Sequence, residues 1–306
     1  MHNHEQHHQL EQHGVVVAVT ELNPPGSHSN APTVVMVHGL RDTAEALRSI
    51  AQRYVAAGYR VLLPHLRGHG RSGHADHYAM PSFLLDLAQV YDTLCKAPVA
   101  LFGHSLGGHI VSKYAALFPE QIRAAMIIEG LGPPTRRHEG DEAAEIAAYR
   151  FMLQARTQRG KARSYQDLQQ VSERLLHNNP RMSPALAAHI APHLTRTTPE
   201  GLTWNFDPIA NSVFIGSSQA ENAKFWRQVQ CPTCLISGTL SYEYWGREMA
   251  DPDFSGRFAE GEMEQRAKNF AHHEHHWFEH SGHMVHYDEP DRLADVTTAF
   301  LEQYHV

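Results

Sequence analysis

The sequence predicts an α/β protein with a mostly parallel, doubly wound sheet and an inserted helical cap. Two observations lead to this prediction. Short apolar runs typical of buried strands alternate with helical patterns, and over residues 134–230 the alternation gives way to successive helical patterns. Parallel strands need long crossover connections, usually helices, so the alternation itself indicates a parallel sheet. We therefore expect a core of residues 1–133 and 231–306, with a cap of residues 134–230.

Seven apolar runs of strand length define the predicted sheet. They lie at residues 15–19, 33–37, 60–63, 98–102, 123–128, 233–237 and 275–279. Helical patterns are found at about residues 44–57, 82–95, 106–117 and 290–303. Strand and helix thus alternate along most of the chain outside the insertion.

Helical periodicity also marks three segments of the insertion, at residues 142–150, 165–171 and 183–190. Ser183 and Pro184 suit the start of a helix, because serine is a favoured N-cap and proline fits the first helical position. A cap of this kind is expected to exclude water and shape a pocket. Its candidate substrate-binding residues are Trp204, Phe206 and Trp226, although packing is the more ordinary role of any single aromatic residue.

Composition narrows the class of protein. A chain of 306 residues is long enough for one domain with an insertion, and its net charge of −7 argues against nonspecific nucleic-acid binding. No apolar run approaches the roughly 18–20 residues of a membrane span, and the N-terminus lacks the apolar stretch of a signal peptide. Three cysteines provide no disulfide framework, so a cytoplasmic location is expected.

The sequence Gly-His-Ser-Leu-Gly at residues 103–107 gives the strongest chemical signal. It follows the apolar run at 98–102 and opens the helical pattern at 106–117. Gly-x-Ser-x-Gly between a buried strand and a helix is typical of a nucleophile elbow, a sharp turn in which glycines permit close backbone approach. The pattern therefore predicts Ser105 as a nucleophile.

A histidine that activates Ser105 is expected late in the chain, after the last predicted strand. The sequence Ser-Gly-His-Met at residues 281–284 places His283 in a loop after the run at 275–279. Because 25 of the residues are histidines, context has to decide. His280 and His286 lack that context, so we expect them to be solvated or packed in the core.

A third element is the apolar run 33–37, which continues as His-Gly-Leu at residues 38–40. A loop after this strand is expected to place the backbone N–H of Leu40 opposite the N–H of Leu106. Two such donors form an oxyanion hole for the intermediate of acyl transfer.

Four motifs together resemble the α/β-hydrolase superfamily, in its serine-nucleophile branch with a helical cap. They lie at residues 34–40, 66–72, 103–108 and 281–284, in the family's order and spacing. The resemblance covers nearly the whole chain, and it implies the α/β-hydrolase fold and serine-type hydrolysis. One departure is His65, where the family usually carries an aspartate with a structural role.

The acid of the triad departs from the usual family position. That position, three residues past the glycine that ends the strand at 233–237, is occupied by Ser241, which cannot carry the negative charge that an imidazolium needs. Glu129 stands instead at the end of the run 123–128, where some branches of the superfamily place their acid. We favour Glu129, with Glu243 as the alternative acid. A reach by Asp251 or Asp253 from the following loop stays open.

Two histidine clusters raise the question of a metal site. They consist of His2, His4, His7 and His8, and of His272, His273, His275 and His276. Neither brings carboxylates or thiolates at the spacing of a zinc site, and the first lies in a tail that is expected to be disordered. The sequence therefore predicts no metal and no cofactor.

These expectations combine into a serine hydrolase that cleaves a small-molecule carboxylic ester through Ser105, His283 and Glu129. Lactone cleavage and carbon–carbon bond hydrolysis use the same triad and remain alternatives. A binding protein that keeps the fold without catalysis is a further alternative, because the usual acid position holds Ser241. The sequence carries no signal for an oligomeric state.

Overall fold

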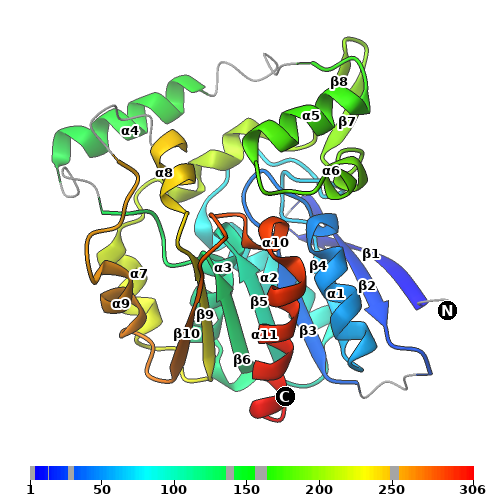
Figure 1. The fold of residues 1–306 in the computed structure, drawn as a ribbon, viewed down its shortest axis with the longest axis vertical. Coiled ribbons are helices and arrows are strands. Elements are labelled where there is room, and N and C mark those ends of the chain that lie inside the picture. The colour runs from blue at the N-terminus through cyan, green and yellow to red at the C-terminus, as the bar shows by residue number, and fades with distance from the viewer. Residues whose placement is uncertain (1–3, 13, 27–30, 136–140, 156–163, 249–254) are drawn as a thin grey trace.

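The computed structural model describes residues 4–12, 14–26, 31–135, 141–155, 164–248 and 255–306. These residues form an eight-stranded sheet in the order β1-β2-β4-β3-β5-β6-β9-β10 (Figure 1). The strands are β1 (His4–Gln12), β2 (Val15–Asn23), β3 (Thr33–Val37), β4 (Arg60–Pro64), β5 (Val99–His104), β6 (Ile122–Ile128), β9 (Thr233–Gly238) and β10 (His273–Phe278). The six strands from β4 to β10 in this order are parallel, and all seven predicted runs lie in the sheet.

The first strand corrects the expectation of a disordered tail. β1 pairs with β2 in antiparallel register over nine residues, from His4 opposite Asn23 to Gln12 opposite Val15. Leu10 is buried, and the His8 imidazole lies 2.7 Å from the Glu21 carboxylate. The expectation is therefore wrong for residues 4–12, because a polar edge strand carries too little apolar pattern to be recognised from sequence. His2 of the first histidine cluster lies outside the described residues.

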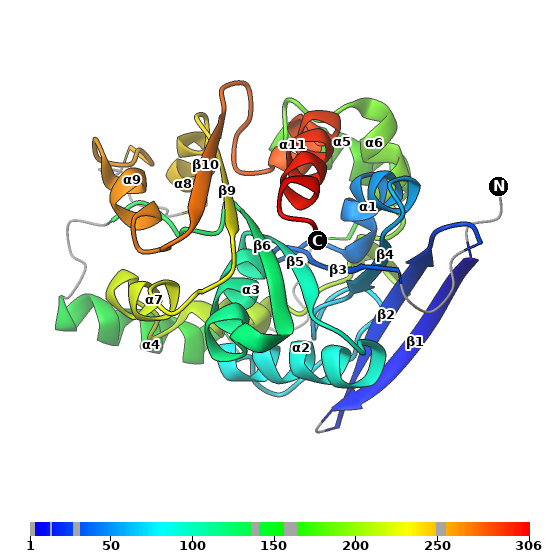
Figure 2. The same cartoon turned by 90° about the horizontal axis from the view of Figure 1, so that it is seen from below.

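Helices cover both faces of the sheet, which confirms the doubly wound arrangement (Figure 2). On one face, α1 (Arg48–Ala56) and α11 (Pro290–Gln303) bury an apolar cluster that includes Tyr54 and Phe300. On the other face, α2 (Met80–Leu94) and α3 (Leu106–Leu117) bury a second cluster that includes Phe83. The predicted helix at 44–57 begins as a short 3₁₀ turn, η1 (Ala44–Leu47), before α1.

The insertion contains α4 (Glu142–Ala155), α5 (Leu168–Asn178), α6 (Pro184–Ile190) and the hairpin β7–β8 (Thr195–Thr198 and Gly201–Trp204). Figure 1 shows these elements beyond the edge of the sheet at which the parallel strands end, together with α8 (Tyr242–Glu248) and α10 (Val285–Asp288). Ser183 caps α6 as predicted, since its hydroxyl accepts from Leu186 N at 3.2 Å. A separate apolar cluster, which includes Val171 and Ile190, holds α5 and α6 together.

The end of the insertion packs on the core. After η4 (Pro208–Phe214), α7 (Gln219–Trp226) lies along α3, where the Lys113 ammonium sits 4.1 Å from the centre of the Phe225 ring. Trp226 stacks on Phe270, which follows α9 (Glu262–Ala267), with ring centres 5.5 Å apart. The last helix of residues 134–230 therefore packs along a helix of the core, and the cap of residues 134–230 stays a prediction. Among the described residues, no helix is both long and apolar enough to cross a bilayer.

Candidate active site

Ser105 occupies the turn between β5 and α3. Its backbone has φ 51° and ψ −114°, a conformation that L-residues rarely adopt. A Cβ atom on Gly103 would lie 2.3 Å from the carbonyl oxygen of Gly107, and one on Gly107 would lie 2.1 Å from that of Val37. Both contacts are with backbone, so only glycine fits at these positions. The turn thus has the tight geometry that the pentapeptide predicts.

The structure joins Ser105, His283 and Glu129 in one chain of hydrogen bonds. Ser105 Oγ lies 2.9 Å from His283 Nε2, and His283 Nδ1 lies 2.9 Å from Glu129 Oε2. The second oxygen, Glu129 Oε1, accepts from the backbone N–H of Gly238 at 2.6 Å. His283 and Glu129 are buried, whereas Ser105 is half-buried. The three side chains lie in the order that nucleophile, base and orienting acid require.

Glu129 is held at the sheet edge by its backbone. Its N–H donates to the carbonyl of Ile236 at 2.8 Å, which continues the pairing of β6 with β9. Its φ of 51° lies in the left-handed region, where a non-glycine residue carries strain. Residues kept in such conformations cluster at functional sites, and this one aims its carboxylate at His283.

The alternative acids are placed differently. Glu243 binds the Arg181 guanidinium at 2.9 Å. Ser241, at the usual acid position, is buried, and its hydroxyl has no hydrogen-bond partner among the described residues. Asp251 and Asp253 lie outside the described residues. Glu129 is therefore the described carboxylate that reaches His283.

The loop after β3, which carries Leu40, passes close to Ser105. A Cβ atom on Gly39 would lie 3.3 Å from the Cβ of Ser105, so the residue before Leu40 has room for no larger side chain on the side of Ser105. The following N–H, from Arg41, donates to His69 Nε2 at 3.0 Å and fixes the loop. On the other side, Leu106 is the first residue of α3, where N–H groups have no partner inside the helix.

The aromatic residues proposed for the cap separate into two groups. Trp204 and Phe206 stack with ring centres 6.5 Å apart, and Phe206 stacks on His69 at 6.2 Å, beside the loop that carries Leu40. Trp226 is only 1% exposed and packs in the core against Phe270. Core packing accounts for Trp226, so we leave it out of the proposed site.

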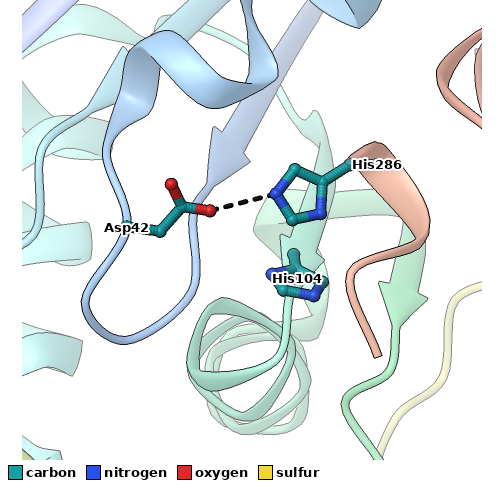
Figure 3. A group of neighbouring side chains, drawn as sticks. All are labelled: Asp42, His104 and His286. Carbon is teal, nitrogen blue, oxygen red and sulfur yellow. Dashed lines mark hydrogen bonds and ion pairs between the residues drawn. The ribbon is translucent and has the colours of Figure 1, made fainter. Parts of the chain in front are cut away.

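A buried polar cluster lies beside the triad, formed by Asp42, His104 and His286 (Figure 3). Asp42 Oδ2 lies 3.0 Å from His286 Nε2, and Asp42 Oδ1 accepts from Tyr287 OH at 2.7 Å and from the Thr43 N–H at 2.8 Å. Burial opposes ionisation of Asp42, but the hydrogen bond and charge of His286 outweigh it and hold the pKa of Asp42 below its usual value.

This cluster has ligand types that suit a transition metal, since two imidazoles and a carboxylate lie within 4.8 Å of one another. The Asp42 oxygens, however, already bind three groups of the protein. His104 Nε2 donates to the carbonyl of His283 at 2.8 Å. We therefore interpret the cluster as a link between the loop after β3 and the loop of His283. A second such group, Cys234 with Glu274 and His276, joins β9 to β10, and burial raises the pKa of the Cys234 thiol.

Several histidines around the site are buried as neutral imidazoles. Burial lowers the pKa of His69 and of His109 to about 3, and it also lowers the pKa values of His38 and His104. The hydrogen bonds agree with neutral rings, because one ring nitrogen of each histidine accepts a hydrogen bond. His38 Nε2 accepts from the Leu66 N–H at 3.0 Å, and His69 Nε2 accepts from the Arg41 N–H at 3.0 Å. Protonation would break both bonds.

We expect the protein to lose stability steeply in mild acid. A histidine whose pKa is lowered by folding binds protons only in the unfolded chain between pH 6.5 and its folded pKa, so stability falls as the pH falls through this window. His69 and His109 each contribute about 1.4 kcal/mol per pH unit, hence about 4 kcal/mol together between pH 6.5 and 5. Urea unfolding at a series of pH values measures this slope, and a free energy of unfolding that stays flat from pH 7 to 5 contradicts it.

Two aromatic residues at the site were not singled out by the sequence. Tyr244 stacks on the His283 imidazole with ring centres 4.1 Å apart and an interplanar angle of 18°. Trp245 meets the same ring edge-on at 4.8 Å. Both lie in α8, which begins just after Ser241. The serine at the usual position of the acid was therefore the sequence feature that pointed to this helix.

The fold has the architecture of an alpha/beta hydrolase, and it brings Ser105, His283 and Glu129 together at the carboxyl ends of the parallel strands. A family model described as alpha/beta hydrolase fold matches residues 32–290, and the chain belongs to this family. This result confirms the resemblance and the fold class.

Relatives at low identity are named as hydrolases. The "Serine hydrolase-like protein" of Danio rerio is 24% identical over 292 residues, which cover 90% of this chain and 82% of that protein. The monoacylglycerol lipase of Mycolicibacterium smegmatis is 33% identical over 128 residues, 39% of this chain and 44% of that protein. The thioesterase domain from the curacin biosynthetic pathway superposes with a TM-score of 0.79 at 22% identity, covering 97% of this chain and all of that domain. At this identity the superposition shows the fold alone.

Proposed function

We propose that the protein is a serine hydrolase that cleaves carboxylic esters through an acyl-enzyme intermediate. The observation that carries the proposal is the hydrogen-bond chain from Ser105 through His283 to Glu129, built on a strained turn between β5 and α3. A serine hydroxyl is a weak nucleophile until an adjacent base takes its proton, and this arrangement supplies that base.

In the proposed first step, Ser105 Oγ attacks the ester carbonyl carbon while His283 Nε2 takes the hydroxyl proton. The carbonyl oxygen becomes an oxyanion, which the N–H groups of Leu40 and Leu106 stabilise. Glu129 holds His283 in the correct tautomer and balances the charge of the imidazolium. The imidazolium then gives its proton to the leaving alcohol oxygen as the carbon–oxygen bond breaks.

In the second step, water attacks the acyl group bound to Ser105, and His283 Nε2 again takes the proton. Collapse of the second tetrahedral intermediate releases the carboxylic acid and returns the proton to Ser105 Oγ. Every proton moves through His283, so the proposed chemistry is complete without a cofactor.

The relatives support an ester substrate, since a lipase and an esterase/lipase are among them. We propose that α5, α6 and the β7–β8 hairpin cover the site, and that Trp204 and Phe206 line its approach to a small-molecule substrate. The three cysteines of the chain are free, which supports a reducing compartment such as the cytoplasm.

Hydrolysis of p-nitrophenyl esters, from acetate to dodecanoate, tests the proposal. Turnover by the purified protein that is lost in the Ser105→Ala variant supports an esterase, and the chain-length profile measures the acyl pocket. Absence of turnover at every length, from a folded protein that also hydrolyses no thioester, contradicts it. Lactones and diketones in the same assay separate the alternatives that share the triad.

A further inference from the structure

Helix α8 stands where the family usually places its acid, and it carries no carboxylate to His283. The loop before it is tied to the loop of His283, because the Leu240 N–H donates to the carbonyl of Ser281 at 3.0 Å. A Cβ atom on Gly238 would lie 2.4 Å from the carbonyl oxygens of Ser281 and Gly282. These close backbone contacts fix α8 beside the imidazole.

The imidazole of His283 is enclosed by aromatic rings. Tyr244 stacks on it nearly parallel, at 4.1 Å and 18°, and Trp245 contacts it at 4.8 Å and 64°. His104 contacts it from the end of β5 at 5.2 Å. Only 2% of His283 is exposed, so these rings replace water around the group that takes a positive charge during the proposed reaction.

Tyr244 is itself held in place by the loop after β3. The Arg41 guanidinium lies within 3.5 Å of the Tyr244 hydroxyl and also pairs with Glu248 at the end of α8. Burial raises the pKa of Tyr244 to about 12, against the opposing charge of Arg41, so its ring stays neutral. Arg41 directly follows Leu40 in the loop after β3. Its contact with Tyr244, and the contact of Tyr244 with His283, therefore connect this loop to the imidazole.

Charged and titratable groups surround His283 from several elements of the fold. Glu129 of the β6 end binds its Nδ1 directly, and His104 of β5 faces it as a buried imidazole. Behind His104 lies the pair of Asp42 and His286. From α8 the charged groups are Glu243, which pairs with Arg181, Glu248, which pairs with Arg41, and Arg247, which donates to the carbonyl of Asn178. Tyr244 thus meets the imidazole on the side of α8, whereas Glu129 binds it from the end of β6.

We propose that Tyr244 is a positioning residue for His283, whose ring keeps the imidazole in its Ser105- and Glu129-bonded orientation and stabilises the imidazolium. The inference rests on the proposed function. An aromatic face attracts a cation, and this attraction is stronger at a desolvated site. The stacked ring also blocks rotation of the imidazole away from Ser105.

Replacing Tyr244 by leucine tests the proposal. The Tyr244 ring attracts the imidazolium of the transition state but not the neutral imidazole of the ground state. We therefore expect the substitution to lower kcat for a p-nitrophenyl ester about 3- to 30-fold, with little change in KM. The acid limb of the kcat/KM profile should move down by roughly 0.5–1 pH unit, since the protonated imidazole is less stabilised. Tyr244→Phe keeps the ring and should restore both values.

Tyr242→Leu is the matched control, because Tyr242 lies in the same helix and its ring packs under the Arg257 guanidinium. This variant should leave kcat and the acid limb unchanged, and thermal melting of all variants excludes general unfolding. An unchanged kcat and acid limb in folded Tyr244→Leu overturns the proposal, as does failure of Tyr244→Phe to restore them.

Histidine NMR separates the failure of this inference from failure of the proposed function. The stacked Tyr244 ring shifts the ring-proton resonances of His283, identified by their loss in His283→Gln. That shift should disappear in Tyr244→Leu and persist in Tyr244→Phe. A wild-type protein that shows the shift but reacts with no ester or fluorophosphonate contradicts the function, whereas an active protein without the shift contradicts the stacking.

Discussion

Substitution of Ser105 by alanine is expected to lower kcat for ester hydrolysis by about 10⁵- to 10⁶-fold. The substitution removes the hydroxyl oxygen that lies 2.9 Å from His283 Nε2, and no acyl-enzyme forms without it. We expect the backbone of the turn to keep its conformation, because it is fixed by the close backbone contacts of Gly103 and Gly107. Residual activity should be no more than the water reaction that the remaining site supports.

The measurement is single-substrate kinetics with p-nitrophenyl esters, supported by thermal melting to show that the variant is folded. Ser172→Ala is the matched control, since Ser172 lies in α5 and its hydroxyl donates to the Leu168 carbonyl at 2.8 Å. This control should retain the kcat of the wild type. A folded Ser105→Ala variant with undiminished turnover would exclude Ser105 as the nucleophile.

Glu129→Gln is expected to lower kcat by about 10⁴-fold. A glutamine amide is neutral, so it cannot balance the imidazolium, and its NH₂ group favours the tautomer with a proton on the wrong nitrogen of His283. The amide oxygen can still accept from the Gly238 N–H, which preserves the fold at the end of β9. The loss should therefore appear in kcat and not in the melting temperature.

Glu243→Gln provides the matched comparison for the acid. Its carboxylate pairs with Arg181 at a half-exposed position, where an ion pair contributes little to stability. We expect kcat to change by no more than a few-fold. If the two purified variants rank in the opposite order, the acid is Glu243 and the hydrogen bond from His283 to Glu129 is structural.

Local patterns were sufficient to predict the elements that carry Ser105 and His283. The apolar run at 98–102 and the helical pattern at 106–117 fix the turn at Ser105, and the run at 275–279 places His283 in the loop after β10. Glu129 was inferred from its place at the end of a buried strand, because neighbouring parallel strands end at one edge of a sheet.

Features that depend on distant partners were missed. The edge strand β1 is polar, and its order comes from pairing with β2. The helix α7 packs along α3, where the Lys113 ammonium sits over the Phe225 ring, and the sequence does not display this contact. Tyr244 reaches His283 because the backbones around residues 238 and 281 approach closely, and a sequence does not display such an approach between separate loops.

The most direct test of the central claim is a map of the covalent adduct formed with a fluorophosphonate. Mass spectrometry of digested wild-type protein should locate the phosphonyl group on Ser105, and Glu129→Gln should label far more slowly. An adduct on another residue, or a folded wild-type protein that stays unlabelled, would contradict a nucleophilic Ser105 activated by His283 and Glu129.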